Sequence, residues 1–326
     1  MAFRIINSFD DFDEFVTVDF EYTLLPGGVP VVINMSAHEN VSGRSWVLWT
    51  DELQSLDQPP FRMDEGALYI CYNATAEFSA HHSLGWDLPT HCLDLHAEER
   101  VLQNGKISGP GTFKLTSTLG RYGLPSLEAD VKEANQRLAM RGAPFTQTEK
   151  QILQDYVKSD TDALDILYPI MIPKIEHPQL ALFRSSYVKA VSYIERYGIP
   201  LCPQVHVLKE LLKERLPQLI EQVDKQYGVY IDGTFTHTLF ADYLDREGID
   251  SWPETASGQL STDKQVFSDF SDIYPQLANL KELRKTISDV GDFKLAIGPD
   301  NRNRTGIMQF TSKTGRNQPS GNQFLF

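Results

Sequence analysis

The chain of 326 residues is 41% hydrophobic and 23% charged with a net charge of −14, and these values predict a globular protein of about two domains. No apolar run approaches the roughly 20 residues of a transmembrane helix, and the acidic N-terminus lacks a secretory signal, so we expect a cytoplasmic protein without a membrane partner. The negative charge also argues against the large basic surface that a sequence-independent duplex-binding protein needs.

The first half of the chain alternates strand-like and helix-like segments. Segments rich in β-branched and aromatic side chains predict strands at residues 16–22, 28–36, 45–50 and 67–73. The Pro-Gly-Gly turn at residues 26–28 predicts a hairpin between the first two strands, and helical segments follow the later ones. Three strands followed by alternating strand and helix predict a mixed α/β layer.

The strand expected at residues 16–22 places two carboxylates side by side. Its apolar residues alternate with Asp19 and Glu21, so a period of two sends the apolar side chains to one face and the acids to the other. Two neighbouring like charges cost free energy unless that face meets water or a cation holds both groups. The strand is therefore compatible with either a solvated edge or a metal site.

Further acids follow at positions where helices are expected. Asn73 follows a strand and can cap a helix, which places Glu77 about one turn into that helix and on the same side. Tyr156 and Asp160 are four residues apart and share a helical face, whereas Asp165 points elsewhere. Taken singly, these acids are more typical of a first-turn glutamate that favours the helix dipole and of a solvated acidic face.

Histidines and cysteines do not predict a zinc site. Four histidines lie close in sequence without zinc-ligand spacing, namely His81, His82, His91 and His96. The cysteines are too few and scattered for a disulfide framework or a zinc cluster, and we expect free, mostly buried thiols at Cys71, Cys92 and Cys202.

From about Pro178 the pattern becomes helical. Apolar residues recur at helical spacing over 183–194, and a Gly-Ile-Pro sequence then ends the helix. A second helical periodicity covers residues 205–223, and another helix is expected at 277–288. The tail from residue 293 is predicted to form strands and turns. It is locally basic, because after Asp300 the only charged residues are Arg302, Arg304, Lys313 and Arg316.

The order of the acidic motifs resembles that of the DEDDy superfamily of 3′→5′ proofreading exonucleases. A strand D-x-E, an Asn-x-x-x-acid at a strand-to-helix turn and a Tyr-x-x-x-Asp helix about 80 residues later match its three motifs. The family is built on a ribonuclease H-like sheet, so the resemblance implies this fold here. The middle motif departs from the pattern, since the family normally has Asp where this chain has Glu77.

The resemblance implies a two-metal site for Mg²⁺ or Mn²⁺, ions that take oxygen ligands and stabilise the charges of phosphodiester hydrolysis. Asp19 is expected to bridge both ions, Glu21 and Asp160 to complete the tighter site, Glu77 to act in the outer shell and Tyr156 to orient the attacking water. Without metal, the four carboxylates repel one another, and at least one should protonate more readily than normal.

The resemblance also implies DNA contacts. Leu25 falls where the family has an apolar wedge against the terminal base, and Asn73 is expected to lie beside the same DNA end. The element Thr314-Gly315-Arg316 resembles a motif of family A DNA polymerases, the DNA polymerase I family, in which the arginine contacts the minor groove of the primer-template. Arg316 is the matching position.

Successive pieces of the second half look like the thumb and the beginning of the palm of family A polymerases, especially of a bacterial and phage branch. We therefore expect an exonuclease domain at residues 1–175, a mostly helical thumb-like region at 176–290 and a short β segment at 291–326. In the family, the polymerase aspartates and the fingers lie beyond the position of Phe326. We expect no nucleotide addition by this chain alone, with a C-terminal polymerase half as a possible partner.

The function expected from these observations is that of a metal-dependent 3′→5′ exodeoxyribonuclease, the proofreading and thumb portion of a DNA polymerase I-like enzyme. Its partner would be DNA, as a single-stranded 3′ end or a primer-template. Glu77 motivates one alternative, a weakly active or inactive nuclease-fold scaffold that binds primer-template DNA. Another is an RNA-directed exonuclease resembling ribonuclease D.

Overall fold

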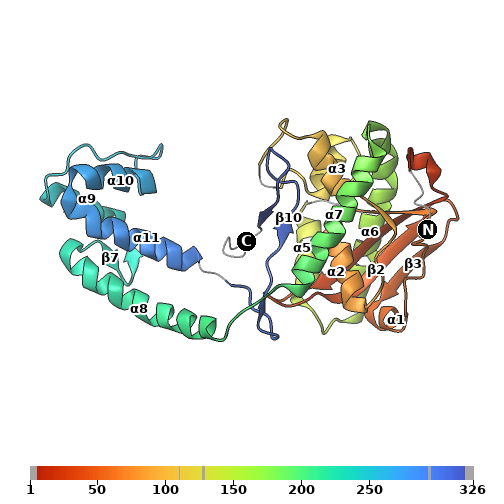
Figure 1. Cartoon of the computed structure of the whole chain (residues 1–326), viewed down its shortest axis with the longest axis horizontal. Coiled ribbons are helices and arrows are strands. Elements are labelled where there is room, and N and C mark those ends of the chain that lie inside the picture. Colours follow the sequence, from red (N-terminus) through yellow and green to blue (C-terminus); the bar gives the residue numbers. More distant parts are fainter. Residues whose placement is uncertain (1–5, 110, 127–128, 293–294, 320–326) are drawn as a thin grey trace. The chain divides into compact units, whose positions relative to one another are not determined.

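The structure is a computed structural model that describes residues 6–109, 111–126, 129–292 and 295–319 (Figure 1). It contains two compact units. The first consists of the described residues up to Pro200 together with those from Leu295 onward, and the second consists of residues 201–292. Among the helices described, none is both long and apolar enough to span a membrane.

The first unit is built on a five-stranded mixed sheet with the strand order β3-β2-β1-β4-β5. Its strands are β1 (Glu14–Thr23), β2 (Val31–Glu39), β3 (Ser45–Trp49), β4 (Ala67–Cys71) and β5 (His91–Asp94). The hairpin strands β1, β2 and β3 pair antiparallel, whereas β4 pairs parallel with both β1 and β5. This arrangement confirms the predicted mixed α/β sheet.

Helices cover both faces of this sheet. They are α1 (Thr50–Gln54), α2 (Ala74–Leu84), α3 (Leu95–Leu102), α4 (Leu115–Arg121), α5 (Ala129–Arg141), α6 (Gln147–Met171) and α7 (Pro178–Tyr197). Side chains alternate between faces along a strand. Accordingly, Tyr69 of β4 shares one core cluster with Phe78 of α2. Its neighbours on the strand, Leu68 and Ile70, share another with Leu164 of α6. The sheet therefore lies between α2 and α6.

The apolar face predicted for β1 is confirmed. Val16, Val18 and Phe20 are buried in the core cluster on the α2 side of the sheet. Asp19 and Glu21 alternate with them and thus point toward the side where α6 packs on β1 and β2. The cysteines are free thiols, of which Cys71 and Cys92 are buried and Cys202 is exposed.

The compact units divide the chain at other points than the expected boundaries at residues 175 and 290. Helix α7 packs against α2 and β5, which places it in the first unit. Directly after it, β6 (Ile199–Pro200) pairs with β9 (Arg302–Asn303), so the C-terminal segment also joins this unit. At Gly198, which has φ +58°, an added Cβ would lie 2.6 Å from the Asn303 carbonyl oxygen. The close pairing therefore requires glycine there.

The second unit is mostly helical, as predicted. Its helices are α8 (Gln204–Tyr227), α9 (His237–Arg246), α10 (Lys264–Ile273) and α11 (Ala278–Asp292), and a small hairpin joins β7 (Tyr230–Ile231) to β8 (Thr234–Phe235). Its core is strongly aromatic and includes Tyr227, Phe240, Tyr243, Trp252 and Phe267. The unit therefore has a core of its own.

The C-terminal segment forms short strands and turns, as expected. Strand β10 (Ile307–Met308) pairs antiparallel with β11 (Gln318–Pro319). Residues 320–326, which belong to the predicted β segment, lie outside the described part of the chain.

Candidate metal centre

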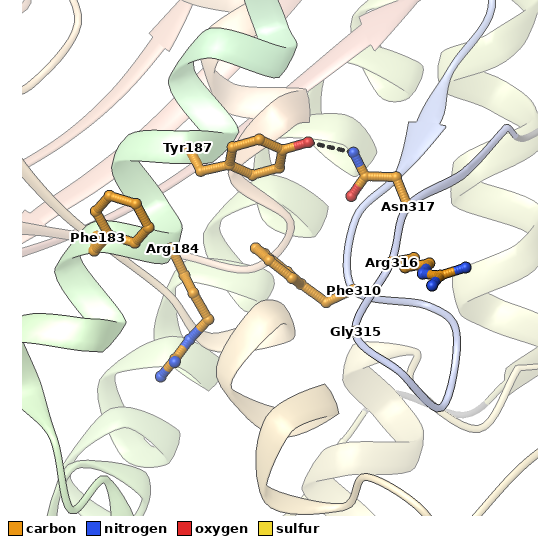
Figure 2. A pocket seen from close by; sticks show the side chains of 7 residues that line it. All are labelled: Phe183, Arg184, Tyr187, Phe310, Gly315, Arg316 and Asn317. Carbon is orange, nitrogen blue, oxygen red and sulfur yellow. Dashed lines mark hydrogen bonds between the residues drawn. The ribbon is translucent and has the colours of Figure 1, made fainter. Parts of the chain in front are cut away.

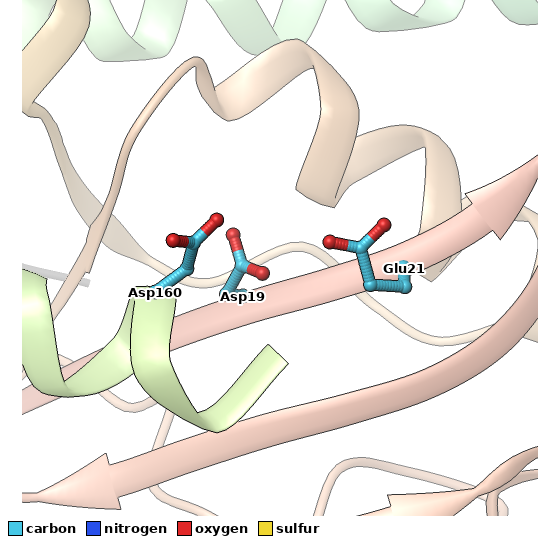
Figure 3. A group of neighbouring side chains, drawn as sticks. All are labelled: Asp19, Glu21 and Asp160. Atoms are coloured by element: carbon cyan, nitrogen blue, oxygen red, sulfur yellow. The ribbon is translucent and has the colours of Figure 1, made fainter. Parts of the chain in front are cut away.

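Three carboxylates from two elements converge beside the sheet. Asp19 and Glu21 lie on β1, opposite Ser36 and Asn34 of β2. Asp160 comes from α6, which crosses this face of the sheet. One carboxylate oxygen of each acid lies within 4.8 Å of the others, and Figure 3 shows the three groups side by side above β1. The structure therefore brings together acids that are far apart in the sequence.

Asp165 holds α6 in the position that places Asp160 over β1. Its Oδ1 accepts hydrogen bonds from the Thr17 hydroxyl and, at 3.0 Å, from the Asn40 side-chain amide. Its Oδ2 lies 2.7 Å from Nδ1 of His38. These partners come from β1, from β2 and from the turn after β2. One carboxylate thus fixes the helix to the strands that carry the other acids.

Tyr156 shares the face of α6 with Asp160, as predicted. Only 5% of its side chain is exposed, and it packs in a cluster with Ile33, Trp49, Ala139 and Leu153. Burial raises the pKa of its phenol, and the neighbouring acids raise it further. The phenol therefore keeps its proton and can donate a hydrogen bond.

Glu77 lies in the first turn of α2, buried and outside the group of three mutually close acids. Asn73 directly precedes this helix, but its side chain makes no capping hydrogen bond, which corrects the expected role. The carboxylate of Asp94 instead accepts hydrogen bonds from the backbone N–H groups of Asn73 and Ala74, at 2.9 and 3.0 Å. It also caps its own helix α3. One buried acid thus holds the starts of both helices.

A lysine side chain brings a positive charge to the acids. Lys132 of α5 places its Nζ 2.7 Å from each oxygen of the Asp160 carboxylate. The same Nζ lies 5.6 Å from the centre of the Tyr156 ring. Both members of the ion pair are largely removed from water, with 21% of the lysine side chain and 13% of the aspartate side chain exposed. Sequence reasoning did not predict this contact of Lys132 with the acid cluster.

The acids repel one another electrostatically, as expected for a site without metal. Burial and the charge of Asp160 raise the pKa of Glu21 to about 8. Burial raises the pKa of Asp19 well above its usual range, and Asp160 and Glu21 raise it further. Burial also raises the pKa of Glu77, with Asp19 as the next cause. Lys132 acts in the opposite direction on Asp19, Glu21 and Asp160.

The acids fit a hard divalent cation. They offer only carboxylate oxygens, the ligands that Mg²⁺ and Mn²⁺ prefer. Oδ2 of Asp19 and Oε2 of Glu77 are buried and have no hydrogen-bond partner in the described part of the chain. Buried oxygens without partners are costly unless an ion or water satisfies them. Asp19, Glu21 and Asp160 can therefore hold the ion, with Glu77 nearby.

The expected DNA contacts lie at separate places on the first unit. Leu25 follows the end of β1 and is 74% exposed. Arg316 belongs to the C-terminal segment and forms no ion pair within the described residues. It lines a groove of about 330 Å³ against α7, shown in Figure 2, in which Asn317 donates a hydrogen bond to the Tyr187 hydroxyl. Phe183 and Phe310 also line this groove.

Fold and site together define a mixed α/β protein with a carboxylate cluster suited to a divalent cation. Neither a protein-family model nor a curated protein sequence matches the chain. Among solved structures, the chain is similar to the POL domain of Pol1 from M. smegmatis in complex with DNA primer-template and dNTP. The TM-score is 0.66 at 16% sequence identity, and the match covers 94% of this chain and 50% of that one. The likeness shows a shared fold, and the chain spans about half the length of the polymerase chain.

Proposed function

We propose that this protein is a metal-dependent 3′→5′ exodeoxyribonuclease, the proofreading and thumb portion of a DNA polymerase I-like enzyme. The observation that carries the proposal is the convergence of Asp19, Glu21 and Asp160 within 4.8 Å of one another. The fold shared with a structure that contains primer-template DNA supports a role on DNA. In this view residues 1–175 form a ribonuclease H-like nuclease domain, 176–290 the thumb-like region and 291–326 the start of a palm.

Each residue of the site has a chemical role in this proposal. Asp19, Glu21 and Asp160 hold Mg²⁺ or Mn²⁺ in a two-metal site, and Glu77 acts in the outer shell. When bound, such ions activate water and neutralise charge that develops on the phosphate. Tyr156 keeps its proton and orients the attacking water by hydrogen bonding.

DNA is placed by groups at the surface. Leu25 is exposed and packs against the terminal base, while Asn73 directly precedes α2, the helix that carries Glu77. Arg316, which forms no ion pair with the described residues, supplies a guanidinium for the primer-template. A single-stranded 3′ end is the substrate, since a processing nuclease stacks on terminal bases and follows the backbone rather than reading base edges.

Incubation with 3′-labelled single-stranded DNA and Mg²⁺ or Mn²⁺ tests the proposal. We expect release of mononucleotides, and Asp19→Asn should reduce the rate at least about 100-fold, because it removes charge from an acid whose carboxylate lies within 4.8 Å of both other ligands. Asp57→Asn changes an exposed aspartate and should retain the wild-type rate. No release, or release unaffected by Asp19→Asn, would refute the nuclease. Faster degradation of an RNA oligonucleotide would instead assign the activity to RNA.

A second candidate is a nuclease-fold scaffold that binds primer-template DNA without cutting it. Two observations favour it: Glu77 stands where the resembling nucleases have Asp, and the Lys132 ammonium already contacts Asp160. A scaffold should bind DNA but release no nucleotide at any Mn²⁺ concentration. The Glu77→Asp variant separates the two readings further, because only a nuclease limited by this side chain should gain activity from it.

A further inference from the structure

The Lys132–Asp160 pair involves both oxygens of a proposed metal ligand. Each oxygen lies 2.7 Å from the ammonium nitrogen, so the lysine binds both oxygens of the carboxylate at once. No other lysine or arginine of the described chain forms an ion pair with Asp19, Glu21 or Asp160. The single positive charge in contact with the cluster thus comes from Lys132.

The position of Lys132 in its own helix does not explain this contact. Lys132 lies near the start of α5, where the helix dipole disfavours a positive charge. The pair is also largely buried, and burying two charges costs free energy unless interactions with neighbouring groups offset it. A cluster of acids without metal needs a counter-charge. The ammonium therefore stabilises the carboxylates and not the helix.

An ammonium group and a divalent cation compete for the oxygens of Asp160. Both are positive, and the ammonium nitrogen lies as close to each oxygen as a hydrogen bond allows. We infer that Lys132 occupies the position on Asp160 that a divalent cation requires, so that metal binding displaces the ammonium and Lys132 sets the metal affinity. This inference rests on the proposed function, since it assigns Asp160 as a metal ligand.

The structure allows the displacement without loss of the fold. About one fifth of the Lys132 side chain, 21%, is already exposed, so the ammonium can turn toward water while α5 stays in place. Helix α5 is held independently through Ala139 in the cluster with Leu153 and Tyr156. Movement of the lysine would also end its contact with the Tyr156 ring.

Calorimetric titration of the full chain with Mn²⁺, in the absence of DNA, tests the inference. We expect Lys132→Met to bind Mn²⁺ at least about tenfold more tightly than the wild type, because the ion no longer has to break a buried ion pair. Lys132→Arg keeps the positive charge and should not show this gain. Lys158→Met is the matched control, because Lys158 forms a comparable pair with Asp162 on the exposed face of α6. It should bind Mn²⁺ like the wild type.

Equal Mn²⁺ affinity of Lys132→Met and the wild type would overturn the inference. Should Lys132→Met fold poorly without metal, Lys132→Gln provides a second neutral side chain, and the rise in melting temperature on adding Mn²⁺ provides a second measurement. That rise should be larger for either neutral variant than for the wild type. Tighter Mn²⁺ binding without nucleotide release would support the inference while refuting the nuclease, so the two proposals fail separately.

Discussion

At the residue scale, Asp19 combines burial, repulsion by neighbouring acids and an oxygen without a hydrogen-bond partner within the described ranges. Its Oδ2 has no hydrogen-bond partner among the described residues, and Asp160 and Glu21 add repulsion to its burial. A residue that is costly in the folded state and is placed among other acids is typical of a functional site. The apolar side chains that alternate with it, Val16, Val18 and Phe20, pack into the core cluster on the opposite face of the strand.

We expect Asp19→Asn to raise the free energy of unfolding of the metal-free protein by about 1–3 kcal/mol at pH 8. Folding raises the pKa of Asp19, so the folded protein holds a proton that the unfolded chain releases above about pH 4, and wild-type stability falls as the pH rises. The advantage of the variant should therefore vanish near pH 4. Urea unfolding in EDTA at both pH values measures it.

The exposed aspartate Asp57 provides the control for this measurement. Asp57→Asn should leave the free energy of unfolding within about 0.5 kcal/mol of the wild type at both pH values. An Asp19→Asn variant that is less stable than the wild type at pH 8 would show that this carboxylate is stabilised by contacts other than those seen here.

At the element scale, the site depends on how α6 is fixed to the sheet. The helix begins with a capping box, in which the Thr146 hydroxyl accepts a hydrogen bond from the Glu149 backbone N–H and the Glu149 carboxylate accepts one from the Thr146 backbone N–H. This cap sets where the helix starts. Asp165 then fixes its position across β1 and β2 through Thr17, His38 and Asn40. Start and position together place Tyr156 and Asp160.

We expect Asp165→Ala to lower the free energy of unfolding by about 2–3 kcal/mol, because the buried Thr17 and the partly buried His38 and Asn40 lose their acceptor. The variant should also bind Mn²⁺ more weakly, since Asp160 loses its fixed position. Chemical unfolding and calorimetric titration measure the two effects.

Asp162→Ala is the matched control on the same helix. Asp162 pairs with Lys158 at the surface, with 59% of the aspartate side chain exposed, and exposed pairs contribute little. Its removal should change the free energy of unfolding by less than about 0.5 kcal/mol. A cost as large as that of Asp165→Ala would contradict the fixing role assigned to Asp165.

Much of the first unit could be predicted from short-range patterns. The alternation in β1 correctly placed Val16, Val18 and Phe20 in the core, and the spacing of Tyr156 and Asp160 correctly placed both on one helical face. Contacts between distant segments could not be predicted. Lys132 lies 28 residues before its partner on a different helix, and no periodicity connects the two.

Capping at the second motif was also predicted incorrectly. Asparagine is a common residue type at helix N-caps, but the backbone of Asn73 is left-handed with φ 77°, and its side chain makes no capping hydrogen bond. The cap comes from Asp94 on a neighbouring strand, a long-range partner that local sequence does not reveal. The division of the chain likewise depended on the packing of α7 and the pairing of β6 with β9.

At the scale of the whole molecule, the net charge of −14 opposes binding to DNA. Favourable contacts must come from a few cations such as Arg316. We expect weak binding of primer-template DNA, with a plot of log affinity against log salt concentration shallower than about −9, the slope for about ten neutralised phosphates. Fluorescence anisotropy at several salt concentrations measures this slope. A steeper slope would contradict the expectation that only a few cations contact the DNA.

The anchoring of α2 by Asp94 has a consequence for how this protein tolerates change. Because Asp94 on a neighbouring strand accepts hydrogen bonds from the N–H groups at the start of the helix, this cap does not depend on a side chain of the helix's own first turn. Residue 77 is thereby not needed as a cap for the helix. Acids of different length can be compared there with this cap intact, whereas a single substitution at residue 94 would disturb two helices at once.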